Sequence, residues 1–344
     1  MTMGKHIEYH PEWVLEDFVD FLAEKVNPLW AWKKAKAQIV AKHHLSDDFV
    51  CMQLQPNRHF KVAGYQAGQS ILVTVLIGGV RWQRSYSIVE ILDNGNLVIA
   101  VRKQGKVSNT LTQQFEKSVV EISQSQGEFV LKTQPHSALM IASGSGITAI
   151  YALINAALKQ TQIVSHIDLI YFTRDDAFHV ELQRLAEHYP QFKYHHINTL
   201  LDKQHLSQDL LSQKVEGFEQ RECYACGAAN MMQSLTQIYQ GLDLIDHLHT
   251  EYFQITVDHT QNAQMVTFQR SQQQFQAQSN LLESAEQAGL RPAHGCRMGI
   301  CNTCSCTKVQ GVVRNLLTGE LDQNNNTQIK LCISQAVSPV VINL

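Results

Sequence analysis

Four cysteines near the C-terminus place the strongest constraint on what this chain of 344 residues can fold into. Cys296, Cys301 and Cys304 follow the spacing C-x4-C-x2-C, and Cys332 lies much later in the chain. Three thiolates from one tight loop and a distant fourth are the plant-type ligand set of a 2Fe–2S cluster. Gly299 lies in the same loop, where the lack of a side chain lets the backbone approach the sulfurs. The spacing therefore predicts a small domain built around a one-electron carrier.

Two other uses of these cysteines fit the sequence less well. Zinc sites usually pair two short C-x2-C or H-x3-H elements, and the second pair is missing here. Disulfides are disfavoured because the N-terminus lacks the apolar stretch of a secretory signal and because a chain of this length can bury a core without crosslinks. Cys306, two residues after Cys304, is interpreted as a buried small hydrophobe.

Length and composition limit the class of protein. The length predicts two or three domains. The formal net charge of -3 lacks the excess of basic residues that is typical of nucleic acid binding. No apolar run approaches about 18 residues, so no transmembrane helix is predicted. Eight cysteines in a chain without a secretory signal fit a reducing cytoplasm, which is the expected location.

The pattern of apolar and polar residues changes along the chain. Residues 11–32 are predicted to be helical, with an apolar face and with Asn27 and Pro28 ending the helix. Short β-runs at regular spacing over residues 35–134 suggest an antiparallel barrel. Apolar strands alternate with helices over residues 135–253, which favours a parallel sheet. A small α+β domain with the cysteine loop follows, with a strand at residues 252–257 and a helix at 281–288.

The sequence R-x-Y-S stands on a predicted strand of the barrel, at Arg84, Tyr86 and Ser87. An arginine suits a phosphate, a tyrosine can lie against a ring, and a serine can hydrogen-bond the N5 region of a flavin. The plain alternative is an exposed strand with ordinary polar residues. Agreement with the motifs further along the chain favours the flavin site.

A second motif follows the next predicted strand and opens a helix at Gly105, Val107 and Ser108. Backbone N–H groups at a helix N-terminus stabilise anions, here a pyrophosphate. The alternative is a plain serine-capped helix, and Ser108 can serve both purposes.

Residues 144–149 form G-x-G-x-x-A between a predicted buried strand and a helix, which loosely fits the dinucleotide fingerprint. The acidic ribose ligand expected after the second strand is replaced by Arg174, Asp175 and Asp176. Arg174 can meet a 2′-phosphate and either aspartate a ribose hydroxyl, so NADPH is expected over NADH.

Cys223 and Cys226 form a C-x2-C pair that resembles a thioredoxin-like motif. That interpretation is rejected because the pair lies at the end of an apolar strand instead of at the start of a helix. Cys226 and Gly227, followed by Met231, are interpreted as a strand-end loop beneath a nicotinamide.

Taken together, these motifs resemble the ferredoxin–NADP reductase superfamily with a plant-type ferredoxin domain at the C-terminus. The resemblance begins at about residue 35 and rests on four motifs in the family's order, at residues 84–87, 105–111, 144–149 and 226–231, together with the cysteines. Ala149 and Ala228 depart from it, because the family often has proline at both positions. Both loops are therefore expected to be less pre-organised.

The resemblance implies four parts: an N-terminal helical extension (1–34), an FAD-binding antiparallel β-barrel (35–135), an α/β NAD(P)-binding domain (136–253) and a β-grasp ferredoxin domain (254–344). It favours FAD over FMN. The implied catalytic residues are Ser87 and Cys226, with Cys226 near the nicotinamide and Glu251 or Phe253 near the flavin. The implied site residues are Arg84, Tyr86, Ser87, Gly105, Val107 and Ser108 for FAD; Gly144, Gly146, Ile147, Thr148, Arg174, Cys226, Gly227 and Met231 for NAD(P)H; and Cys296, Cys301, Cys304 and Cys332 for the cluster.

The implied activity is that of an NAD(P)H-dependent oxidoreductase, in which FAD takes a hydride and passes single electrons through the cluster to an acceptor. The N-terminal extension, with three tryptophans in residues 13–32 beside lysines, is most similar to reductases that serve membrane-bound fatty acid (stearoyl-CoA 9-) desaturases. Fatty acid desaturation and peripheral contact with the inner face of the membrane are therefore expected. A helix packed on the barrel is the alternative to a membrane contact. The alternatives for function are the reductase of a Rieske-type or other hydroxylase, and a redox sensor without catalytic flux.

Overall fold

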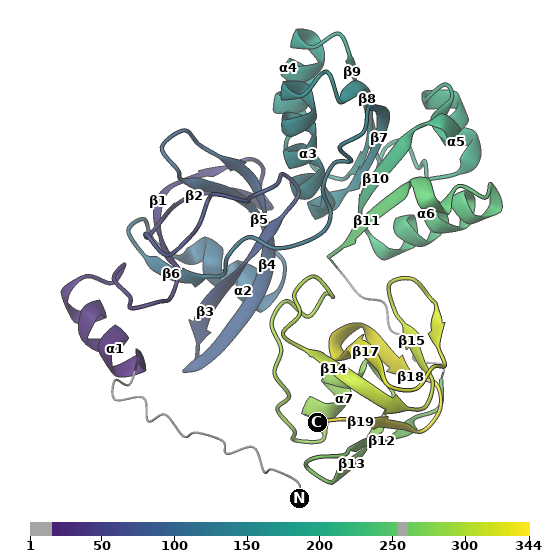
Figure 1. Cartoon of the computed structure of the whole chain (residues 1–344). Coiled ribbons are helices and arrows are strands. Elements are labelled where there is room, and N and C mark those ends of the chain that lie inside the picture. The colour runs from purple at the N-terminus through teal and green to yellow at the C-terminus, as the bar shows by residue number, and fades with distance from the viewer. Residues whose placement is uncertain (1–15, 254–260) are drawn as a thin grey trace, which may run out of the picture.

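The computed structural model describes residues 16–253 and 261–344. It consists of an antiparallel barrel, a parallel sheet covered by helices, and a small mixed domain, with a short helical segment at the N-terminal side of the barrel (Figure 1). This architecture confirms the multi-domain fold that the sequence predicts. In the described part of the chain, no helix combines the length and the apolar character needed to cross a membrane.

The first domain is a closed barrel with strand order β1-β2-β5-β4-β3-β6, in which every neighbouring pair is antiparallel. Its elements are β1 (Lys36–His44), β2 (Phe49–Pro56), β3 (Ser70–Ile77), β4 (Val80–Ile91), β5 (Leu97–Arg102), α2 (Gly105–Gln113) and β6 (Val119–Ile122). Alternating apolar side chains fill the barrel, and Val107 and Leu111 of α2 pack against that core. Strand β5 pairs with β4 and leads directly into α2, so β4 and α2 lie beside each other.

The second domain is a parallel sheet with strand order β11-β10-β7-β8-β9. Its strands are β7 (His136–Ser143), β8 (Val164–Thr173), β9 (Phe192–Asn198), β10 (Glu222–Gly227) and β11 (Leu248–Tyr252). Its helices are α3 (Ile147–Lys159), α4 (His179–His188), α5 (Gln208–Lys214) and α6 (Ala229–Gly241), with short 3-10 turns at Gly144–Gly146, Phe218–Gln220 and Ile245–His247. The strand order reverses at β7, so the crevice at the carboxyl ends of β7 and β10 is the expected ligand position.

One apolar core joins the barrel to the parallel sheet. Phe49, Val89 and Ala100 of the barrel belong to the same buried cluster as Ile147 and Leu153 of α3. The helix after β7 is therefore packed between the two domains, as Figure 1 shows. This shared core fixes the start of α3 beside β4, where the R-x-Y-S residues lie.

The third domain is a β-grasp fold whose main sheet has the order β13-β12-β19-β14-β17. Its strands are β12 (Gln264–Phe268), β13 (Gln273–Ala277), β14 (Ser305–Gln310), β17 (Thr327–Lys330) and β19 (Val340–Ile342), and a smaller sheet contains β15 (Val313–Asn315), β16 (Leu321–Asp322) and β18 (Ser334–Ala336). Helix α7 (Leu281–Gln287) packs on this core, and a 3-10 turn covers Leu331–Ile333. The Asn280 side chain caps α7 by accepting from the Glu283 amide at 2.9 Å. The loop from α7 to β14 lies on the side that faces the barrel (Figure 1).

The N-terminal helix α1 (Glu16–Val26) ends directly before Asn27 and Pro28, as the sequence predicts. Residues 11–15 of that predicted helix, and residues 254–257 of the predicted strand at 252–257, lie outside the described residues. The strand in the latter region instead covers Leu248–Tyr252.

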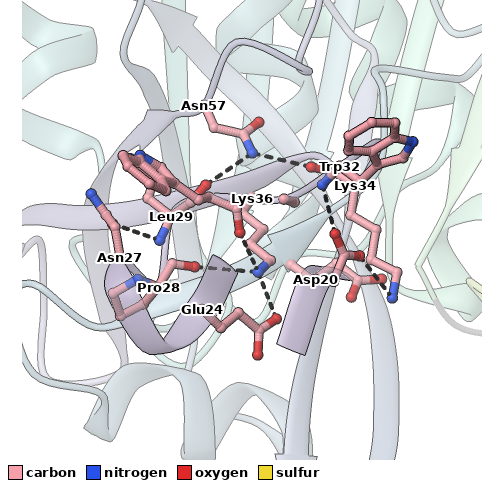
Figure 2. A network of polar contacts seen from close by, with 12 residues as sticks. Asp20, Glu24, Asn27, Pro28, Leu29, Trp32, Lys34, Lys36 and Asn57 are labelled. Atoms are coloured by element: carbon pink, nitrogen blue, oxygen red, sulfur yellow. Dashed lines mark hydrogen bonds and ion pairs between the residues drawn. The ribbon is translucent and has the colours of Figure 1, made fainter. Parts of the chain in front are cut away.

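A buried lysine holds α1 and the segment after it against the barrel. In Figure 2 the Lys36 side chain, at the start of β1, points toward Glu24. Its ammonium group lies 2.6 Å from the Glu24 carboxylate and 3.0 Å from the Trp30 carbonyl oxygen. The Asn57 side-chain amide donates to the Leu29 carbonyl at 3.1 Å. Because an ammonium group has three donors and this one is buried, the contact fixes the segment in one place.

Replacing Lys36 with methionine is expected to lower the free energy of unfolding by about 1–3 kcal/mol, because carbonyl groups of residues 28 and 30 lose their donor. The matched control is Lys103→Met, since Lys103 is exposed and donates to the Asp47 carbonyl at 2.8 Å. That control is expected to cost less than about 1 kcal/mol. Unfolding of the wild-type protein and the two variants in guanidinium chloride measures the difference. Equal losses of unfolding free energy in both variants would contradict the stabilising role of the Lys36 contacts.

Candidate functional site

The three domains meet around a cavity of about 590 Å³, here called the central cavity. Its walls come from β4, from the start of α2, from the start of α3 and from the cysteine loop. The lining residues used below are Trp82, Arg84, Tyr86, Ser87, Arg102, Gly105, Lys106, Val107, Ser108, Thr148, Phe253, Glu283, Cys296, Arg297 and Cys332. The two motifs of the barrel and two of the four cysteines therefore face one space.

The R-x-Y-S residues contact the other motifs directly. The Tyr86 hydroxyl lies 3.0 Å from the Ser108 hydroxyl, which joins the second motif to the first. Burial raises the pKa of Tyr86, so the phenol stays protonated. The Thr148 hydroxyl donates to the Ser87 hydroxyl at 3.4 Å, and both side chains are buried. The structure thus brings together Ser87 of the barrel and Thr148 of the parallel-sheet domain.

The donor groups of the central cavity fit a flavin nucleotide. Arg84, Arg102, Lys106 and Arg297 bring four cationic side chains to its wall, against the single carboxylate of Glu283. The backbone of Gly105 has a φ of +80°, a conformation that favours glycine at the start of α2. The buried Nε1 of Trp82 has no hydrogen-bond partner in the described structure. A phosphate group would satisfy the excess positive charge, and a polar ring edge could satisfy a buried donor.

A second cavity, also of about 590 Å³, lies at the carboxyl ends of β7, β8 and β10. Its lining includes Ser143, Gly144, Ser145, Thr173, Arg174, Asp175, His205, Gly227, Ala228, Met231 and Phe253. Arg102, Ser145 and Phe253 line both cavities, so the two spaces adjoin. This position at the strand-order reversal, with Arg174 on the wall, fits a phosphorylated dinucleotide.

Two glycines let the loops of the second cavity interlock. A Cβ atom at Gly146 would lie 1.9 Å from the carbonyl oxygen of Cys226, and one at Gly227 would lie 2.5 Å from the Ser143 hydroxyl. The Ala228 amide donates to that hydroxyl at 2.8 Å. The loop after β7 and the loop after β10 therefore touch at a distance that only glycine allows.

Not every residue implied by the resemblance lines the second cavity. Gly144, Arg174, Gly227 and Met231 do. Thr148 faces the central cavity instead, beside Ser87. Ile147 is fully buried in the core between the domains, and Gly146 and Cys226 lie behind the wall.

The two cysteines of the C-x2-C pair point to opposite faces of the sheet. Cys223 packs among the residues below α5 and α6, and Cys226 packs in the core shared with the barrel. Side chains three positions apart on a strand face opposite ways, so these thiols cannot form a redox pair. The sequence interpretation placed the pair away from a helix start. In fact α6 begins at Ala229, and the geometry of the strand, not its distance from a helix, is what rules out the redox motif.

A buried carboxyl group lies next to Cys226, behind the wall of the second cavity. Glu251 on β11 is paired in register with Cys226 on β10. It is 5% exposed, and its Oε2 has no hydrogen-bond partner in the described structure. Burial raises the pKa of Glu251 to about 8, and burial together with Glu251 raises the pKa of the Cys226 thiol. Both groups are therefore largely protonated near neutral pH.

The four cysteines of the C-terminal domain form two pairs. The Cys301 amide lies 3.2 Å from the Cys296 sulfur, and the Cys296 amide lies 3.3 Å from the Cys301 sulfur. The Cys304 and Cys332 sulfurs are 3.4 Å apart. Across the described residues, no three His, Cys, Asp or Glu side chains converge on one point as the ligands of a single ion would. Two thiol pairs fit the two irons of a 2Fe–2S cluster better than they fit one zinc ion.

The cysteine loop closes against the barrel. Leu72 of β3 forms a small apolar cluster with Cys296 and Cys301, and Met298 and Ile300 pack against it. All four cysteines are buried, with Cys296 and Cys332 on the wall of the central cavity. Gly299, at a φ of +78°, lies where a Cβ would come within 3.0 Å of Ile333. The ligand loop is thus held directly beside the flavin motifs.

Comparison with known proteins agrees with this geometry. Residues 36–131 match the oxidoreductase FAD-binding domain, residues 140–237 the oxidoreductase NAD-binding domain, and residues 266–337 the 2Fe-2S iron-sulfur cluster binding domain. The chain is therefore an electron-transfer oxidoreductase with ferredoxin-reductase-type FAD and NAD domains and a C-terminal 2Fe–2S domain, and its cofactors are FAD, NAD(P)H and the cluster.

Known proteins are similar to this chain over most of its length. An NADPH oxidoreductase of Mycobacterium tuberculosis is 28% identical over 92% of this chain and 86% of its own length. The phthalate dioxygenase reductase of Burkholderia cepacia is 24% identical over 89% of this chain and 96% of its own length. A solved structure of phthalate dioxygenase reductase has a TM-score of 0.61 at 23% identity and covers 90% of this chain and 97% of its own.

Several residues of the site were not found from the sequence. Lys106, Trp82 and Arg297 line the central cavity, and none of the three was assigned a role from the sequence. Arg297 directly follows the first cysteine, and Trp82 lies two positions before Arg84 on the same strand. The period of two along a strand could have pointed to Trp82, because it faces the same side as Arg84 and Tyr86.

Glu251→Gln is expected to remove a pH dependence of stability. The folded-state pKa of about 8 lies above the ordinary value of 4.5, so the carboxyl's contribution is fully present below pH 4.5 and is lost as the pH rises through 8. The wild-type protein should therefore lose a few kcal/mol of unfolding free energy relative to the glutamine variant across that window. Chemical unfolding of both proteins at pH 5, 7 and 9, values that span this pH range, measures the difference in their unfolding free energies. A difference that stays constant with pH would contradict a buried neutral carboxyl.

Proposed function

We propose that this protein is the reductase component of an oxygenase system, which passes single electrons from NAD(P)H to an oxygenase of the Rieske type. The observation that carries the proposal is the central cavity, where Cys296 and Cys332 share a wall with Arg84, Tyr86 and Ser87. When bound, FAD supplies the exchange between the two-electron chemistry of a nicotinamide and the one-electron chemistry of the cluster.

The chain's own residues provide binding, orientation and exclusion of water. Arg84, Ser108 and the start of α2 would hold the diphosphate, and Tyr86 would contact the ring system. Ser87, held by Thr148, presents a hydroxyl for hydrogen bonding to the reacting edge of the flavin. Cys226, directly behind the loops of the nicotinamide side, is a protonated and uncharged group, with Glu251 beside it on the neighbouring strand.

Arg174 supports NADPH as the preferred nucleotide. It lines the second cavity after β8, where a guanidinium group can pair with a 2′-phosphate that NADH lacks. Replacing Arg174 with glutamine should raise the KM for NADPH by about 10- to 100-fold and leave the KM for NADH nearly unchanged. Steady-state kinetics with both nucleotides measures this, and an equal change for both would contradict the assignment.

The similarity to phthalate dioxygenase reductase over nearly the whole chain supports the Rieske-type partner. The test mixes the protein with purified Rieske oxygenase components and follows the NAD(P)H-dependent reduction of their iron–sulfur centre. Reduction well above the rate without this protein supports the proposal. Failure with several such components, together with turnover in membranes that contain a desaturase, would contradict it.

A membrane-bound fatty acid desaturase is the second candidate acceptor, and one surface favours it. Trp30 and Trp32 are 56% and 54% exposed, and Leu22 and Val26 of α1 are also exposed. Exposed tryptophans suit a membrane interface. Formation of unsaturated product in such membranes, lost in a Trp30→Ser/Trp32→Ser variant that still reduces cytochrome c, would favour this acceptor. Rapid reduction of cytochrome c by the wild-type protein would also count against a redox sensor without catalytic flux.

A further inference from the structure

Two guanidinium groups from different domains share the central cavity. Arg84 comes from β4 of the barrel, and Arg297 comes from the cysteine loop of the C-terminal domain. Figure 1 shows that loop on the side of its domain that faces β3 and β4. Leu72 and Cys296 are in contact across the same boundary, so the two domains meet directly beside the arginines.

The four cations that line this cavity face one carboxylate there, Glu283. Glu286 and Asp48, which pair with Arg297 and Arg102, do not line the cavity. In the described structure, Arg84 donates to the backbone carbonyl of Gln83 at 2.8 Å. Burial first, and then the nearby charge of Arg297, lower the pKa of Arg84. Lys106 lies over the Trp82 ring at 4.7 Å and adds a further cation to the wall. Arg84 and Arg297 are half-buried. An arrangement in which two half-buried guanidinium groups repel each other is stabilised by an anion bound between them.

Arg297 is held in position from behind. Its Nη1 donates to Glu286 Oε2 at 2.8 Å, its Nη2 donates to Glu286 Oε1, and His294 Nε2 lies 2.8 Å from Nη2. A guanidinium group has five N–H donors in a fixed plane, so donors remain for a ligand after the contacts to Glu286 and His294. Glu286 belongs to α7, which fixes the direction of the side chain. The plain alternative is that the ion pair with Glu286 only fastens the cysteine loop to α7.

We propose that Arg297 is an FAD-binding residue supplied by the iron–sulfur domain, and that it holds the FAD diphosphate together with Arg84 of the barrel. The flavin nucleotide then joins the two domains and fixes the cluster ligands beside the ring system. Glu286 is a positioning residue, because it acts on the diphosphate through Arg297.

The test compares FAD with riboflavin, which has the same ring system but no phosphate. Protein freed of flavin, with its cluster retained, is titrated with each ligand, and binding is followed by flavin fluorescence. Arg297→Gln should weaken FAD binding by about 10- to 100-fold, the effect of one charge-assisted contact, and change riboflavin binding less than about twofold. Arg291→Gln is the matched control, because Arg291 is exposed in the same domain and does not line the cavity.

Glu286→Gln provides a second variant in which the arginine remains but loses its anchor. It should weaken FAD binding by a smaller factor and again leave riboflavin binding unchanged. Iron content and the cluster absorption spectrum show whether each variant keeps its cluster. The proposal is overturned if Arg297→Gln leaves the affinity for FAD unchanged, or if it weakens both ligands equally. If that variant does not retain iron, an unchanged ratio of FAD to riboflavin affinity in Glu286→Gln overturns the proposal.

Discussion

Cys304→Ala is expected to lower electron transfer to cytochrome c by more than about 100-fold, because removal of a direct cluster ligand costs more than the loss of an outer-shell contact. Cys304 forms one of the two thiol pairs, with its sulfur 3.4 Å from that of Cys332. Reduction of ferricyanide by NAD(P)H should persist, because ferricyanide is small enough to be reduced at the flavin site without the cluster. Parallel assays with the two acceptors, together with an iron count, measure the effect.

Cys306→Ser is the matched control for this experiment. Cys306 lies two residues further along, and burial raises its pKa to about 12, so it remains a neutral thiol in the core of the same domain. Its replacement should leave iron content and cytochrome c reduction close to the wild-type values. If both variants lost cytochrome c reduction to the same extent, the assignment of the ligand set would be wrong.

Gly146→Ala is expected to raise the KM for NAD(P)H by about 10- to 100-fold, because a shift of about 1 Å in a binding loop can cost that much. The added Cβ would meet the Cys226 carbonyl oxygen at 1.9 Å, so the loop after β7 and the loop after β10 must move apart. Both loops form the wall of the second cavity. Steady-state kinetics with ferricyanide as the acceptor measures nucleotide use without involving the cluster.

Gly241→Ala controls for the substitution itself. Gly241 ends α6, and a Cβ there would have no atom within 4 Å. Alanine also favours the helix over glycine by roughly 1 kcal/mol. This variant should keep the wild-type KM. A normal KM in Gly146→Ala would contradict the close approach of the two loops.

Local patterns were sufficient to predict the cofactor motifs. Most of the motifs lie where a strand meets a helix or a loop, and the R-x-Y-S motif lies within β4. The chemistry of each depends on residues close together in sequence, such as Tyr86 with Ser87 or Cys301 with Cys304. The strand order was not predicted, but the short β-runs correctly indicated a barrel, and the alternation of strands and helices correctly indicated a parallel sheet. The helices α5 and α6 were missed. Helix α5 has only seven residues, and the start of α6 was interpreted as part of the loop that follows the cysteine motif.

Contacts between distant segments could not be predicted. Glu286 and Arg297 meet through a loop whose path no local pattern specifies, and the contact of Thr148 with Ser87 joins positions 61 residues apart. In the sequence, Lys36 belongs to a run of basic residues. Only the fold shows that it is buried and paired with Glu24. These contacts depend on how the three domains pack together, and the sequence alone carries no periodic signal for that packing.

The presence of all three electron carriers in one chain is tested most directly by an anaerobic titration of the purified protein with NADPH, followed by absorption spectroscopy and by flavin and iron analysis. The account predicts FAD and a two-iron cluster in each chain, and bleaching of both the flavin bands and the cluster absorption in wild-type protein. In Cys304→Ala, only the flavin bands should bleach. Wild-type protein that contains FAD but binds no iron, even after anaerobic reconstitution with iron and sulfide, would contradict it.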